Sequence, residues 1–174
     1  TDYSHVPPDV LEHACQIGKA VHRACELFDT DDLMMDSVDP RIVGYLAAWQ
    51  RFKAESGFVV ELNEQKVFSA IHKYAGTLDR VGVFHGLLGQ PRAVLEIKTT
   101  AHFMPSFGPQ LAGYFNAIVE SKLFDASTTK GIKRYAVQLR KEGTYRLEQY
   151  IDRNDWSVFL SCLTLWKWRK NLER

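Results

Sequence analysis

Hydrophobic residues recur at two spacings along this chain, and each spacing predicts a different kind of element. In residues 8–28, 40–56, 109–122 and 155–172 they recur every three to four positions, as in helices with one buried face. In the segments 58–62, 66–70, 76–84, 92–98, 133–139 and 144–151 they alternate with polar residues or form short apolar runs, which is typical of strands. This order of segments predicts an α/β fold, a mixed central β-sheet flanked by helices, of the restriction-endonuclease-like kind.

Composition narrows the expected class of protein. Of the 174 residues, 45% are hydrophobic, which suits a single domain over residues 1–174. The net charge is +1, so a surface that binds nucleic acid would have to be local. No apolar run reaches the length of a membrane span and no signal-peptide pattern is present, so we expect a cytoplasmic protein without membrane contact. The cysteines lack metal-binding spacing, which predicts reduced, buried thiols and no iron–sulfur cluster held by this chain alone: Cys15, Cys25 and Cys162.

Among the charged residues of the two central strand segments, three could form one site. Asp79 lies in the first segment, and Glu96 and Lys98 lie in the second, beyond a turn rich in glycine. Alternate side chains share a face of a strand, so Glu96 and Lys98 project together while Leu95 and Ile97 point into the core. A hairpin across the turn would bring Asp79 beside Glu96.

Each of these charges alone is explained by the solvated face of an antiparallel sheet. Together, two carboxylates and one ammonium suit metal-assisted hydrolysis of a phosphodiester. Carboxylate oxygens favour Mg²⁺ or Mn²⁺, and such an ion polarises the phosphoryl oxygen and lowers the pKa of a bound water. Lys98 could orient that water or neutralise the charge that develops on phosphorus.

This arrangement resembles a known family. Asp79 followed by Glu96-Ile97-Lys98 is similar to the core motif of the PD-(D/E)xK nuclease superfamily, with Leu78 in place of the proline in the family's name. The resemblance covers roughly residues 10–150.

Two flanking helices extend the resemblance to the RecB-type and viral exonuclease branch. Gly18 and His22 match a Gly-x-x-x-His motif, and Gln110 and Tyr114 match a Gln-x-x-x-Tyr motif. Without that context, a histidine beside an apolar helix face is more often a satisfied core residue. Gln110 and Tyr114 are four apart and share one face of their helix.

The resemblance implies a Mg²⁺-dependent deoxyribonuclease, most of whose relatives are exonucleases of viral or bacterial DNA recombination and repair, with products that carry a 5′-phosphate. Mn²⁺ is expected to substitute. It implies metal ligands at Asp79, Glu96, the Ile97 carbonyl and His22, a catalytic Lys98, and DNA contacts at Gln110 and Tyr114. Thr99, which follows the lysine, could donate to a phosphate.

Several alternatives stay open at this point. The chain could be an endonuclease, a nucleic-acid-binding domain that has lost catalysis, or a structural domain with a charged sheet face. A recombination or repair partner protein, or a homo-oligomer, would help a chain of near-zero net charge to stay on DNA. Strand polarity, single or double strands, and DNA or RNA are undetermined. Either Glu61 or Glu64 could add a further acid to the site.

Two other segments carry expectations. The acidic run at residues 26–39 predicts a solvated loop. The loop at residues 101–109 is either a substrate-contact loop or a packed connection. The last helix is expected to pack on the sheet through its apolar residues, which are Trp156, Phe159, Leu160, Leu163, Trp166 and Trp168.

Overall fold

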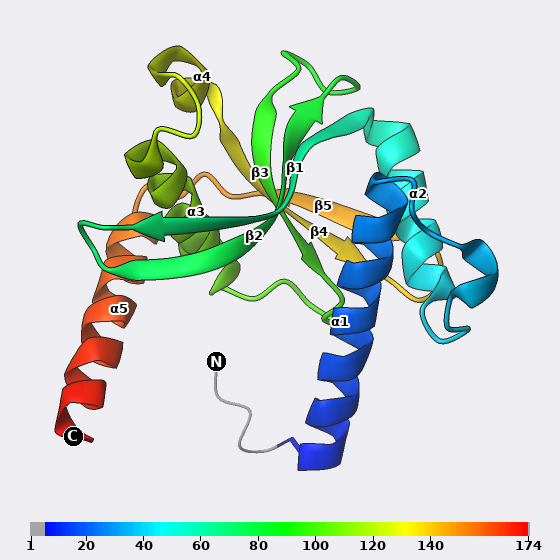
Figure 1. Ribbon diagram of the computed structural model, residues 1–174, viewed down its shortest axis with the longest axis horizontal. Helices are drawn as coiled ribbons and strands as arrows, with labels where there is room; N and C mark the ends of the chain where they lie inside the picture. The colour runs from blue at the N-terminus through cyan, green and yellow to red at the C-terminus, as the bar shows by residue number, and fades with distance from the viewer. Residues whose placement is uncertain (1–5, 174) are drawn as a thin grey trace.

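A five-stranded β-sheet with helices on both faces forms the centre of the structure, a computed structural model that describes residues 6–173 (Figure 1). The predicted α/β class with a mixed central sheet is therefore confirmed, while the ends of the predicted domain, residues 1–5 and 174, lie outside the described residues. The elements are α1 (Pro8–Asp29), the short 3-10 helix η1 (Met35–Ser37), α2 (Val43–Ser56), β1 (Phe58–Ser69), β2 (Tyr74–Phe84), β3 (Arg92–Lys98), α3 (Phe107–Ser121), α4 (Ala126–Gly131), β4 (Lys133–Leu139), β5 (Tyr145–Gln149) and α5 (Asp155–Leu172).

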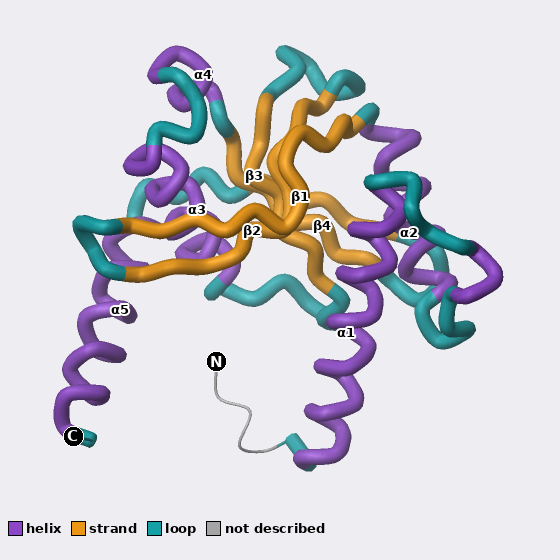
Figure 2. Tube along the Cα trace, viewed as in Figure 1, coloured by secondary structure: helices purple, strands orange, loops and turns teal. Residues whose placement is uncertain are grey.

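The strands lie in the order β1-β2-β3-β4-β5, so each strand pairs with its neighbour in sequence. Figure 2 shows the strands crossing at the centre of the molecule with the helices around them. β3 and β4 run parallel, whereas the other neighbouring pairs are antiparallel. A parallel pair needs a connection that crosses a face of the sheet, and α3 and α4 form that connection. The predicted hairpin is present as β2 and β3, and the segments 58–62 and 66–70 form one continuous strand, β1.

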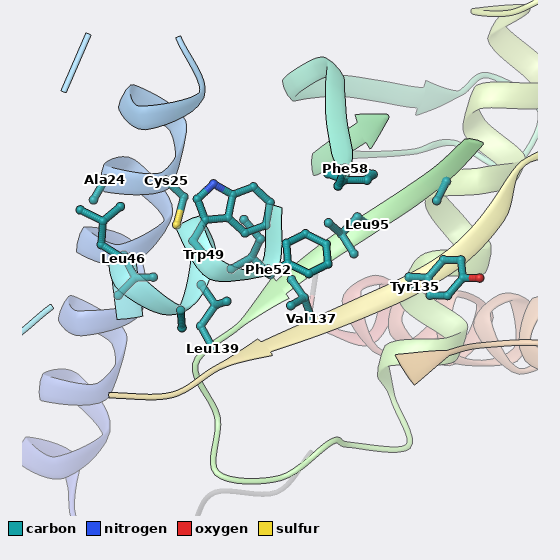
Figure 3. Close-up of a cluster of buried hydrophobic side chains, with 14 of the residues drawn as sticks. Ala24, Cys25, Leu46, Trp49, Phe52, Phe58, Leu95, Tyr135, Val137 and Leu139 are labelled. Carbon is teal, nitrogen blue, oxygen red and sulfur yellow. The ribbon is translucent and has the colours of Figure 1, made fainter. Parts of the chain in front are cut away.

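The two faces of the sheet bury separate hydrophobic clusters. On one face, α1 and α2 cover β3 and β4, with Trp49 and Phe52 fully buried between them (Figure 3). On the other face, α3 packs through Leu111 and Ile118. Successive residues of β3 alternate between the clusters, with Leu95 in the first and Val94 in the second. This alternation places the side chain of Glu96 on the α3 face.

Helix α2 shows how local sequence sets an element boundary. Residues 40–42 form a turn, so the helix begins at Val43 rather than directly after Pro40, and Val43 is exposed although it belongs to the hydrophobic spacing of this segment. The helix ends where expected, at Gly57, which has a left-handed φ of 60°. A Cβ at Gly57 would lie 2.9 Å from the Gly86 nitrogen, so glycine also permits close contact with the β2–β3 turn.

The prediction of a solvated acidic loop is wrong at its start. α1 continues to Asp29, whose side chain is 0% exposed and paired with Arg80 of β2 and Lys53 of α2. Asp31 and Asp32, which follow, are exposed as predicted. The loop therefore begins at Thr30, four residues after the start of the charge run, because one of its acids is required inside.

The prediction that α5 packs on the sheet is also wrong for most of its length. Its first part contacts α3 and the β1–β2 hairpin, and Lys167 Nζ donates to the His72 carbonyl at 2.6 Å, while Trp166 and Trp168 are 58% and 60% exposed. Figure 1 shows the C-terminal turns of α5 extending away from the sheet. Leu165 and Leu172 are exposed as well, so α5 presents apolar residues around its circumference.

Three smaller differences from the sequence predictions concern single side chains. Cys25 is buried, but Cys15 and Cys162 are exposed, so only one of the three thiols lies in the core. Val119 belongs to the hydrophobic spacing that predicted a buried face for residues 109–122, yet it is 43% exposed. No helix within residues 6–173 is both long and apolar enough to cross a membrane.

Candidate active site

Strands β2 and β3 separate at one end of their ladder, and Asp79 lies at the point of separation. The last paired residues are Arg80 and Leu95, so the Ile97 backbone lies beyond the ladder with β2. The Asp79 carboxylate takes the place of a strand partner, because its Oδ2 accepts a hydrogen bond from the Ile97 N–H at 2.6 Å. Asp79 is only 5% exposed, so this bond holds its carboxylate in a fixed orientation.

Helix α1 brings His22 to the same point. Its Nδ1 lies 3.3 Å from Asp79 Oδ1, and its Nε2 lies 3.1 Å from the Ile97 carbonyl oxygen. Gly18, one turn earlier, sits beside the end of β3, since a Cβ there would lie 3.6 Å from Thr99 Oγ1. Burial lowers the pKa of His22, but the hydrogen bond to Asp79 and nearby carboxylate charges outweigh it and raise the pKa. His22 thus contacts the strand carboxylate rather than filling the apolar core.

Glu96 is the centre of a polar group on the α3 face. Its Oε1 accepts hydrogen bonds from Lys98 Nζ and Gln110 Nε2, each at 2.8 Å. Gln110 Nε2 also lies 3.1 Å from the hydroxyl of Tyr114, and Lys98 Nζ lies 3.2 Å from Gln110 Oε1. The structure therefore brings the two residues of the α3 motif together with the two charged residues of β3. Glu96 Oε2 is buried and has no hydrogen-bond partner within residues 6–173.

The alternative between Glu61 and Glu64 is resolved in favour of Glu64 as the neighbour of the site. His22, Glu64 and Asp79 each offer a ligand atom, and these atoms all lie within 4.8 Å of one another. Glu64 has an unusual left-handed φ of 48° in the middle of β1. Glu61 instead forms a two-fold ion pair with Arg92, both contacts at 2.6 Å, at the other end of the β2–β3 ladder.

A buried ion-pair network centred on Arg80 contacts the cluster of His22, Glu64 and Asp79 through Glu64. Arg80 is 0% exposed and donates to Asp29 Oδ2 at 2.7 Å and to Glu64 Oε1 at 2.9 Å. Asp29 Oδ1 in turn accepts from Lys53 at 2.6 Å and from Trp49 at 3.1 Å. Sequence reasoning missed this network, although an arginine inside an apolar strand is itself a signal, because a buried guanidinium requires an acidic partner.

The electrostatics of the cluster fit a bound divalent cation. Burial, together with the neighbouring charge of Asp79, raises the pKa of Glu64 and raises the pKa of Glu96 to about 7. A cation would offset this repulsion, and the unpaired Glu96 Oε2 is a free ligand atom. The donors are carboxylate oxygens, the Ile97 carbonyl and one imidazole, a set that suits Mg²⁺ or Mn²⁺. Glu96 lies outside the compact group formed by His22, Glu64 and Asp79.

The remaining predicted residues lie around the cluster of His22, Glu64 and Asp79. A surface cavity of about 370 Å³ adjoins the cluster on the α1 side, lined by Gly18, Lys19, His22, Arg23, Glu26 and Glu64. Thr99 is half-buried beside α1, directly after Lys98. The loop after Thr100 is a packed connection, because Phe103 and Met104 pack against the hydrophobic cluster under α3.

No protein-family model matches the sequence, and no curated protein matches it. The function must therefore be inferred from the side chains of the site, their geometry and the sequence motifs that they form.

Proposed function

We propose that this protein is a divalent-metal-dependent nuclease of the PD-(D/E)xK type that hydrolyses DNA phosphodiester bonds. The observation that carries the proposal is the convergence of four elements on two adjoining polar groups at one end of the β2–β3 ladder, one around Asp79 and one around Glu96. β2 supplies Asp79, β3 supplies Glu96 and Lys98, α1 supplies His22, and α3 supplies Gln110. A structural sheet face would not need these polar groups to meet from both sides of the sheet.

The roles of the residues follow from their contacts. Asp79, Glu96, the Ile97 carbonyl and His22 would hold the metal, and Glu64 is placed to join them. When bound, the metal polarises a phosphoryl oxygen and lowers the pKa of a water. Asp79 is oriented by the Ile97 N–H, so the ligand set is preorganised before substrate arrives.

The remaining residues act on water and substrate. Lys98 places its ammonium beside Glu96, where it could hold the attacking water and neutralise charge on the phosphoryl oxygens. Hydrolysis joins the oxygen of that water to phosphorus and breaks the bond to the 3′ oxygen, which leaves with a proton. Gln110 and Tyr114 stand beside Glu96 and would position the strand.

A test of this function uses end-labelled linear DNA incubated with Mg²⁺, with Mn²⁺, and with EDTA. We expect shortening of the DNA with either metal and none with EDTA, because the carboxylates need a cation to act on an anionic phosphate. DNA binding without any cleavage under all conditions would instead support the nucleic-acid-binding alternative. Neither binding nor cleavage would contradict both.

We further expect the nuclease to work from DNA ends. The chain has a net charge of +1 and therefore little attraction for the backbone of a duplex without an end or a partner. The measurement compares one plasmid, linearised and covalently closed, at equal concentration with Mg²⁺. The linear form should be degraded and the closed circle should persist. Equal rates of loss would move the proposal to an endonuclease acting at the same site.

Lys98→Ala should separate binding from catalysis. Lys98 lies 2.8 Å from Glu96 but is not a metal ligand in this scheme, so the variant should still bind Mn²⁺ and DNA. Cleavage should fall about 100-fold or more, as expected on loss of a group that stabilises developing charge. Calorimetric titration with Mn²⁺ and a cleavage assay on the same sample give the two readouts. Loss of Mn²⁺ binding in the folded variant would contradict the role given to Lys98.

A further inference from the structure

A cavity of about 530 Å³ lies next to the candidate active site, between the β1–β2 turn, α3 and α5. Its walls are mainly aromatic and aliphatic, with one lysine and no acidic residue of the described chain. The residues that line it are Lys73, Tyr74, Ala75, Gly76, Gln110, Gly113, Tyr114, Phe159, Leu163 and Trp166. The exposed C-terminal part of α5 thus forms one side of a defined cavity.

The aromatic walls are held in place by specific contacts. The Tyr74 hydroxyl donates to the Gly113 carbonyl at 2.7 Å, and its ring meets Phe159 edge-on at 4.8 Å between centroids. Glycine is needed where the walls come closest. A Cβ at Gly113 would lie 2.7 Å from the Phe159 ring, and a Cβ at Gly76 would lie 2.8 Å from the Tyr114 ring. The cavity is therefore a fixed aromatic surface.

The cavity adjoins the polar group around Glu96 in the candidate active site. Gln110 and Tyr114 line it, and Gln110 also donates to Glu96 Oε1 at 2.8 Å. A single side chain therefore separates the aromatic walls from the proposed metal-binding carboxylate. A molecule in the cavity would therefore lie next to Gln110 and close to Glu96.

We propose that this cavity binds an unpaired base of the DNA strand adjacent to the scissile phosphate. The inference rests on the proposed nuclease function, and it specifies that the site takes a single-stranded or frayed end. Aromatic side chains stack on any base without reading its sequence, and a lysine such as Lys73 can meet the backbone phosphate. The absence of acidic residues from the lining of the described cavity suits a polyanion, and its continuity with Glu96 favours nucleic acid over a peptide.

Trp166 offers a sharp test, because the same helix carries a matched control. Trp166 lines the cavity and is 58% exposed, whereas Trp168 is 60% exposed and does not line it. Both can be replaced without opening the core. The measurement is fluorescence anisotropy of a labelled oligothymidylate, and of a DNA hairpin with a closed blunt end, with Ca²⁺ in place of Mg²⁺. Ca²⁺ takes the same kind of oxygen ligands.

Trp166→Ala should weaken binding of the oligothymidylate about 10-fold, the effect of one lost base stack. Trp168→Ala should leave it unchanged, and Trp166→Phe, which keeps a ring, should restore most of the affinity. The blunt hairpin should bind equally to all three variants. Equal binding of the oligothymidylate to Trp166→Ala and Trp168→Ala, or no binding to the unaltered protein, would overturn the proposal.

The two proposals fail in different ways. If the unaltered protein cleaves DNA with Mg²⁺ but Trp166→Ala binds the oligothymidylate normally, the proposed nuclease function is supported and the proposed base-binding role of the cavity is wrong. If Trp166 is required for binding but no metal supports cleavage, the cavity stands and the nuclease function is wrong.

Discussion

Glu96→Gln should abolish DNA cleavage while leaving the protein folded. Glutamine keeps the shape of the side chain and an oxygen that can accept from Lys98 and Gln110, but it removes the negative charge. Loss of a charged ligand costs several kcal/mol of transition-state stabilisation. Since about 1.4 kcal/mol corresponds to a factor of ten in rate, we expect a decrease of roughly a thousandfold or more. The measurement is the rate of shortening of end-labelled linear DNA with Mg²⁺.

Glu61→Gln is the matched control for this experiment. Glu61 is an acid in the same sheet whose partner is Arg92, and it lies outside the cluster of His22, Glu64 and Asp79. The Glu61→Gln variant should cleave DNA at the rate of the unaltered protein. Thermal melting of both variants shows whether the fold is intact. Full activity in a folded Glu96→Gln variant would rule out Glu96 as a catalytic ligand.

Asp29→Asn should destabilise the protein by about 3–5 kcal/mol, the range seen when one partner of a buried ion pair is removed. Its side chain is 0% exposed and accepts from Arg80, Lys53 and Trp49. Arg80 would keep Glu64 as its remaining charged partner, and one of its terminal nitrogens already lacks a hydrogen bond. A buried guanidinium in that position is costly, because its attraction to Asp29 no longer offsets its desolvation.

Urea denaturation measures this effect through the midpoint and slope of the transition. Asp32→Asn is the control, because Asp32 belongs to the same acidic run but is exposed. It should change the free energy of unfolding by less than about 0.5 kcal/mol. Equal midpoints for the two variants would contradict the structural role given to Asp29.

The parts of the site that sequence could predict are those fixed by local spacing. Glu96 and Lys98 share a face because alternation within a strand demands it, and Gln110 and Tyr114 share a face because they are one helical turn apart. The pairing of β2 with β3 followed from the short turn between them. In each case a few neighbouring residues determine the outcome.

The choice of Glu64 over Glu61 could not be predicted, because it depends on how β1 meets β2. The β1–β2 ladder shifts register between Val60 and Leu62, so that Glu61 is an extra residue in β1. A shift of one residue exchanges the two faces of a strand from that point onward. Nothing in the alternation of hydrophobic residues marks where such a shift occurs.

Arg80 and α5 show a second limit of prediction from the sequence, which concerns contacts between residues that are distant in the chain. The charge of Arg80 is visible in the sequence, but its partner Asp29 stands 51 positions earlier in a run of acids that looks solvated. In α5 the abundance of apolar residues suggested burial, yet Trp166 and Trp168 are only two positions apart and cannot face one surface together. Apolar content alone did not reveal which residues of α5 contact the body.

The position of His22 has a consequence for the cooperativity of unfolding. The contact between His22 and the Ile97 carbonyl joins residues 75 positions apart, so closing it carries a large entropic cost and requires the sheet to have formed. The β2–β3 hairpin could persist through a local opening of α1, but the cluster would then lack its histidine. An opening of the whole of α1 would also have to break the pair between Asp29 and Arg80, whose side chains are both fully buried. Local unfolding of α1 is therefore tied to the stability of the sheet interior, and catalytic competence should be lost together with the global fold rather than before it.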